Sequence, residues 1–162
     1  MASCIWSTIL YPNVFSRNEN RIEEIDKENK IIINKHKRTT RSLLKEFLAK
    51  LLYNKLIEIY DELRSENKVE ILGDIDFKVV GCIDKKATKL AKIKDNKILV
   101  RLNNVVLPKS ALKYVVTHEI AHIFTRSHNE YFWKLLKIIY PNFLEGKLQL
   151  EKYEDILRSK ML

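Results

Sequence analysis

The chain has 162 residues, 46% of them hydrophobic, with only three glycines and three prolines, which suits one modest domain and argues against collagen-like or turn-rich all-β architectures. Its two cysteines, Cys4 and Cys82, are far apart, which argues against a disulfide framework or a four-thiolate zinc site. The net charge is +9. No apolar run is long enough to cross a bilayer, and the apolar patch 4–10 is not preceded by the basic residues of a signal peptide. We therefore expect a cytoplasmic protein without a membrane partner.

The first 38 residues show no regular apolar pattern, and we expect an N-terminal arm (1–38) ahead of one domain (39–162). The domain is predicted to begin with a long helix from about residue 39 or 40 to the polar run at 62–68. Apolar residues recur there at intervals of three and four and form one stripe: Leu43, Leu44, Phe47, Leu48, Leu51, Leu52, Leu56 and Ile59.

Short strands are predicted after this helix. Residues 69–72 indicate an extended segment, and apolar and polar residues then alternate over 75–79, as in a half-buried strand. A loop over 81–86 separates this strand from another at 97–102. We therefore expect a small antiparallel sheet.

Helices are predicted for the rest of the chain. Pro108 can start a second helix over roughly 109–124. Residues 125–127 interrupt it, a third helix runs to about Tyr140, and a last one covers about 150–159. Together these elements predict a compact α+β domain.

The stretch that indicates chemistry is His118-Glu119-Ile120-Ala121-His122, inside the predicted second helix. Two histidines four residues apart lie one turn apart on one helix face, so both imidazoles can reach a single metal ion. Glu119 lies about 100° round the helix and can accept a hydrogen bond from a water on the metal. This spacing is typical of metallopeptidases.

A third histidine supports a metal site. Ser127 and Glu130 form a capping-box pattern, which predicts that His128 opens the third helix and that this helix folds back toward the second. Three neutral imidazoles leave a fourth tetrahedral position open, as in catalytic zinc sites. We therefore predict zinc (Zn2+) held by His118, His122 and His128.

Several alternatives stay open. Glu151, which forms a Glu-x-x-x-Asp pair with Asp155, is a competing third ligand of the kind found in glutamate-type zincins. The remaining histidine, His36, lies among basic residues and is predicted to be a surface residue. A group that stabilises the developing oxyanion is expected from one of three candidates: Tyr114, Arg126 or Tyr131.

The basic residues gather in two segments. Residues 27–50 and 78–101 each hold eight basic and two acidic side chains, whereas residues 51–76 hold three basic and seven acidic ones. This clustering suits a nucleic-acid partner, but it is also typical of a lysine-rich surface that is merely soluble.

The motif region resembles a known group of enzymes. Residues 114–123 read Tyr-Val-Val-Thr-His-Glu-Ile-Ala-His-Ile, and His128-Asn129 precede Phe132-Trp133. This run resembles the YgjP-like and SprT-like metallopeptidases and the related WLM-type proteases, in which a ligand histidine and an aromatic pair follow the His-Glu-x-x-His helix. The resemblance covers roughly residues 40–142 and departs at 89–93, where many YgjP-like members carry Trp-Gly-Ser-Cys.

The resemblance implies a zincin-like domain that hydrolyses peptide bonds in a protein or peptide substrate. From the motif we expect Glu119 to act as general base toward a metal-activated water. The strand over 98–102 is expected to pair with an extended substrate. Because SprT-like and WLM-type enzymes act on DNA-crosslinked proteins, a DNA-associated protease is the alternative, with a metal-bearing hydrolase of a non-peptide substrate as a further one.

Overall fold

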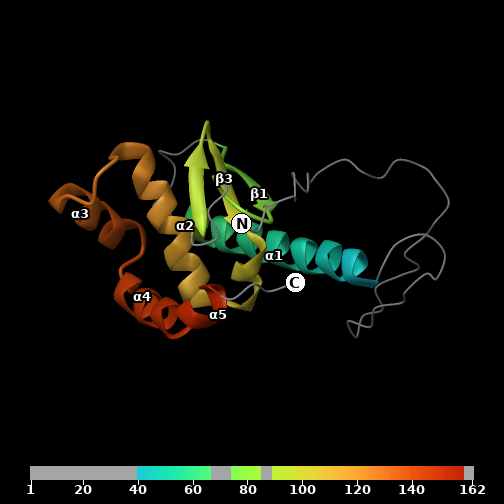
Figure 1. Ribbon diagram of the computed structural model, residues 1–162. Coiled ribbons are helices and arrows are strands. Elements are labelled where there is room, and N and C mark those ends of the chain that lie inside the picture. Colours follow the sequence, from blue (N-terminus) through green and yellow to red (C-terminus); the bar gives the residue numbers. More distant parts are fainter. Residues whose placement is uncertain (1–39, 67–73, 85–88, 159–162) are drawn as a thin grey trace.

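The computed structural model describes residues 40–66, 74–84 and 89–158 (Figure 1). The predicted arm, the extended segment 69–72 and His36 lie outside the described residues. The described elements, in chain order, are α1 (Thr40–Ser65), β1 (Asp76–Val80), β2 (Ala91–Lys94), β3 (Lys97–Arg101), the 3-10 helix η2 (Leu102–Val106), α2 (Lys109–Phe124), α3 (Glu130–Ile139), α4 (Phe143–Lys152) and α5 (Glu154–Arg158). The α+β fold predicted from the sequence is confirmed.

The long helix α1 forms because its 26 residues include no glycine or proline and carry an apolar stripe. Leu52, Leu56, Ile59 and Leu63 of this stripe are at most 1% exposed. They pack in the main core, where α1 contacts β1, η2 and α2. The prediction of this helix is confirmed, and the helix ends at Ser65, inside the polar run where its end was predicted.

The three strands form one mixed sheet in the order β1-β3-β2. The β2–β3 pair is an antiparallel hairpin, whose two-residue turn holds Asp95 and Asn96 at φ 50° and 57°, as a type I′ turn requires. β1 and β3 run parallel, so the prediction of a purely antiparallel sheet is wrong for this pair. The reason is that β2, a short strand with two lysines that was not predicted, carries the chain back before β3 joins β1.

The strand order also corrects the expected substrate strand. β3, the strand predicted over 97–102, lies in the middle of the sheet with β1 and β2 on its two sides. A central strand has no free edge to offer a peptide, so the expectation that residues 98–102 pair with substrate is wrong. β2 is the edge strand that packs against α2, and the two lie side by side in Figure 1.

The helices after the sheet confirm most of the prediction. α2 begins directly after Pro108 and ends at Phe124, as predicted. α3 is capped by Asn129, whose side chain accepts a hydrogen bond from the backbone N–H of Phe132 at 3.0 Å. The predicted capping box is therefore wrong, because asparagine is as good a cap as serine and lies closer to the apolar run. His128 precedes the cap instead of opening the helix.

The last part of the chain holds α4, which begins at Phe143, well before the helix predicted from about residue 150. A break at Tyr153 separates α4 from α5. Gly146 lets α4 approach α2, since a Cβ atom there would lie 2.6 Å from the carbonyl oxygen of Ser110 and 2.8 Å from Cβ of Tyr114. No helix among the described residues is long and apolar enough to cross a membrane.

Candidate metal centre

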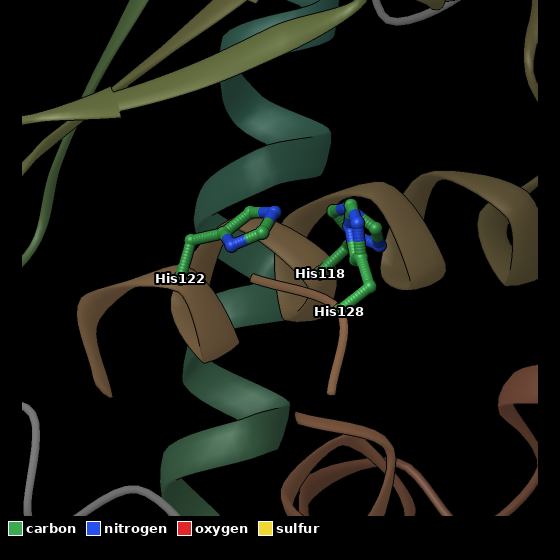
Figure 2. Close-up of side chains that lie close together, drawn as sticks. All are labelled: His118, His122 and His128. Carbon is green, nitrogen blue, oxygen red and sulfur yellow. The ribbon is translucent and has the colours of Figure 1, made fainter. Parts of the chain in front are cut away.

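Three imidazole rings face one another where α2 turns toward α3 (Figure 2). His118 and His122 come from the last two turns of α2, and His128 comes from the connection that leads into α3. Nε2 of His118 lies 3.0 Å from Nε2 of His128, and one nitrogen from each ring lies within 4.8 Å of the others. The structure therefore brings together the three histidines that the sequence predicts as ligands.

Hydrogen bonds hold the ring of His122 and the backbone of His128. Nδ1 of His122 lies 3.0 Å from the carbonyl oxygen of Thr125, which can only accept a hydrogen bond, so Nδ1 carries the proton and Nε2 is left as the ligand atom. The indole N–H of Trp133 donates to the carbonyl oxygen of His128 at 3.2 Å. The first contact sets the tautomer of His122, and the second holds the backbone of His128 against α3.

A buried aromatic ring lies against all three histidines. Phe132 is 0% exposed, and its ring centroid lies 4.9 Å from those of His118 and His122 and 4.6 Å from that of His128. Phe132 belongs to the smaller core cluster that joins α2, α3 and α4. Packing against this ring restricts how far each imidazole can turn.

The environment favours the neutral form of His118 and His128. Burial, with smaller contributions from His122 and His128, lowers the pKa of His118 to about 4. Burial and then His122 also lower the pKa of His128. Neutral imidazole is the form that binds a metal ion. Nδ1 of His118 is buried without a hydrogen-bond partner among the described residues, which leaves that ring uncommitted to any protein acceptor there.

These residues fit a divalent ion that prefers nitrogen ligands. Two nitrogens held by one tetrahedral ion at ~2.0–2.1 Å lie roughly 3.3 Å apart, close to the observed spacing of His118 and His128. The competing ligand Glu151 and its partner Asp155 are exposed on α4 and α5, outside the group of three histidines. The geometry thus favours His128 as the third nitrogen.

Glu119 lies beside this group and contacts β2. Its Oε2 accepts a hydrogen bond from the backbone N–H of Ile93 at 2.9 Å. Burial raises the pKa of Glu119, while the Ile93 hydrogen bond, His122 and Lys89 act in the opposite direction. A carboxylate with a raised pKa is better suited to take a proton near neutral pH.

A groove of about 620 Å³ runs between β2 and α2 and contains His118, Glu119 and His122. Of the three predicted oxyanion-stabilising residues, the buried Tyr114 and the exposed Arg126 line this groove. Tyr131 is 56% exposed on α3 and is not among the lining residues. The remaining lining residues are Lys89, Leu90, Ala91, Lys92, Ile93, Val115 and Leu150.

The sequence did not reveal the contribution of β2. The lining residues Ala91 and Ile93 come from this strand, and the amide of Ile93 holds Glu119. Alternation of apolar and lysine residues over 90–94 was the available signal, but four residues are too few to predict a strand with any specificity.

One of three comparisons with known proteins agrees with the geometry. A family model described as YgjP-like, metallopeptidase domain, matches residues 11–153, which includes part of the predicted arm. A search of curated proteins gave no match. The crystal structure of the metallopeptidase zymogen of Pyrococcus abyssi abylysin is 19% identical, with a TM-score of 0.47 over 64% of this chain and 99% of that one, a likeness too weak to support an inference. Because the family model covers most of the chain, this protein belongs to the YgjP-like family and is a metallopeptidase.

Proposed function

We propose that this protein is a zinc-dependent peptidase in which Glu119 is the general base. The observation that carries the proposal is the set of three imidazoles, His118, His122 and His128, gathered within 4.8 Å of one another beside the groove that holds Glu119. These three residues would hold the ion. A set of three nitrogen ligands with an open fourth position is characteristic of catalytic zinc.

The proton transfers are assigned to Glu119. When bound, zinc supplies Lewis acidity, which lowers the pKa of a water molecule to near 7 and polarises the scissile carbonyl. Oε2 of Glu119 is engaged by the amide of Ile93, so we assign the proton to Oε1. Glu119 takes this proton from the attacking water and later delivers it to the leaving amine.

The outer edge of β2, on which the N–H of Ile93 already donates to Glu119, supports binding of an extended substrate through its other outward groups. The N–H of Ile93 faces Glu119, so its peptide group points away from β3. In an antiparallel pair this orientation alternates, so the peptide groups of Ala91 also point outward, whereas those of Lys92 face β3. A peptide added along this edge would lie between β2 and α2, over the histidines.

The other functions expected from the sequence lead to different results. A DNA-associated protease would show cleavage that DNA stimulates, and this stimulation would fall steeply with salt. Residues 27–39 of the first basic segment, 27–50, lie outside the described residues, and no contact in the described part of the chain favours this alternative. A hydrolase of non-peptide substrates would release product from such substrates and leave peptides intact.

Metal analysis of the purified full-length protein tests the proposal. We expect about one zinc per chain after purification without chelator, and peptide cleavage that a chelator abolishes and zinc restores. Less than about 0.2 zinc per chain after reconstitution, or full activity in chelator, would contradict the proposal.

A further inference from the structure

We propose that the groove selects substrates with an acidic side chain, and that Lys89 and Lys92 bind this carboxylate beside β2. The inference rests on the proposed peptidase function and names the substrate class of the same site. It starts from an arrangement of charges on the β2 wall of the groove that the proposed mechanism does not use.

Two ammonium groups converge at this wall on a single carboxylate. Nζ of Lys92 lies 2.9 Å from Oδ1 and 2.8 Å from Oδ2 of Asp84, and Nζ of Lys89 lies 3.2 Å from Oδ2. The hydrogen bonds from Lys92 and then Lys89 hold the pKa of Asp84 below its usual value. This position therefore already has the donors and the positive charge that bind a carboxylate.

The two lysines retain capacity for a second carboxylate. Each ammonium carries three N–H donors, so the contacts with Asp84 do not exhaust them. All three side chains are partly open to solvent, with exposed fractions of 41% for Lys89, 35% for Lys92 and 43% for Asp84. Ion pairs with this exposure contribute little to stability, so sharing the ammonium groups with a substrate would cost little.

The charge balance of the groove favours the same substrate class. Its lining residues include three cations, Lys89, Lys92 and Arg126, and one carboxylate, Glu119, which is largely enclosed and bonded to Ile93. With Asp84, which pairs with both lysines, the balance is three cations to two carboxylates and stays positive by one charge. Glu151, whose charge acts on Tyr114, belongs to α4 and not to the β2 wall. A divalent ion would make the groove more positive still, so an acidic side chain is attracted and a basic one repelled.

The register of β2 specifies where the acidic residue binds. The outward N–H and C=O of Ala91 and the outward C=O of Ile93 flank Lys92, so a substrate strand that pairs with them places one residue opposite Lys92. Directly opposite residues on paired strands have Cβ atoms roughly 5 Å apart. The preference should therefore be strong at one substrate position and weak at the others.

The surroundings favour a peptide over a nucleic acid. Besides the cations, the groove is lined by the apolar side chains of Leu90, Val115 and Leu150 and runs along a strand edge. Tyr114 is the one tyrosine among the lining residues, which include no phenylalanine or tryptophan, and it is buried, so it offers no exposed face on which a base could stack.

The experiment compares internally quenched peptides that share one sequence and carry Asp, Asn or Lys at one scanned position. With zinc-loaded full-length protein at low salt, we expect kcat/KM at one position to be about five- to tenfold higher for the Asp peptide than for the Asn peptide, and lowest for the Lys peptide. This Asp/Asn ratio should shrink as the salt concentration rises, because salt screens the charges. Lys89→Gln and Lys92→Gln should lower the Asp/Asn ratio toward one. Lys137→Gln, which removes an exposed lysine of α3 outside the groove, should leave the ratio unchanged.

Melting and zinc content establish that each variant is folded, and binding of the same peptides to Glu119→Gln protein gives a readout without turnover. An Asp/Asn ratio near one at every position, or one that survives in the Lys89→Gln/Lys92→Gln double variant, would overturn the inference and leave the peptidase function standing. If Lys92→Gln instead abolishes binding of a single-stranded oligonucleotide without changing the ratio, the wall binds nucleic acid and the inference is wrong. If zinc-loaded protein cleaves none of the peptides, the proposed function itself fails.

Discussion

The three histidines differ in how the protein orients them. His122 is held through its own ring by the carbonyl of Thr125, whereas His128 is held through its backbone by the indole of Trp133. His118 has neither contact among the described residues and depends on packing against its neighbours and Phe132. In the described part of the chain, neither the ring of His118 nor that of His128 is thus fixed by a hydrogen bond to a protein carbonyl, and the position of His128 depends on its backbone contact with α3.

The identity of the third ligand can be tested directly. His128→Ala should lower zinc affinity more than about a hundredfold, because loss of a ligand exceeds the effect of losing its supporting residue. Glu151→Ala should change affinity less than about twofold, because this exposed carboxylate lies outside the histidine group. Chelator competition measures both values. The reverse ranking would move the site to a glutamate ligand.

Trp133→Phe tests the support of His128. The substitution keeps an aromatic ring but removes the N–H that donates to the His128 carbonyl. A lost hydrogen bond of ~1 kcal/mol should weaken zinc binding about three- to tenfold while melting changes little. Tyr131→Phe, at an exposed position on the same helix, is the matched control. An equal loss of affinity in both variants would show that the indole has no specific role.

At the scale of elements, α2 brings most of the site together, and its contribution could be predicted because spacing on one helix converts directly into geometry. The period of a helix was enough to predict the relative positions of three side chains, those of His118, Glu119 and His122. The contact between Glu119 and Ile93 could not be predicted, because it joins residues 26 apart in sequence through the placement of β2 in the sheet. The parallel pairing of β1 with β3 was missed for the same reason, since pairing partners depend on the path of the whole chain.

The close approach of α4 to α2 predicts a sensitive position. Gly146→Ala would place a methyl group 2.6 Å from the carbonyl oxygen of Ser110, a backbone atom that cannot move aside freely. We expect the free energy of unfolding to fall by roughly 1–3 kcal/mol, as for other overpacked sites. Lys147→Ala, at an exposed position of the same helix, should be near neutral. Urea denaturation measures both, and equal stability of the two variants would contradict this packing.

At the scale of the whole molecule, the metal centre would tie the α2–α3 connection to the core. Zinc that binds the folded chain but not the unfolded one stabilises it by about 2.7 kcal/mol at a hundredfold excess over Kd. For a domain of this size we therefore expect a chelator to lower Tm by roughly 5–10 °C and added zinc to restore it. Differential scanning calorimetry with and without chelator measures the shift, and an unchanged Tm would argue against zinc as a structural link.

The role of Glu119 is tested by measuring the activity of Glu119→Gln protein together with its zinc content. Glutamine has nearly the shape of glutamate but cannot take a proton at neutral pH, so the three imidazoles should keep the metal while the general base is lost. We expect one zinc per chain, unchanged melting, and a kcat at least ~10²–10⁴-fold below that of the wild type, whereas Glu145→Gln on the exposed surface of α4 should be fully active. A Glu119→Gln protein that cleaves peptides at the wild-type rate, or one that loses its zinc, would contradict the role assigned to Glu119.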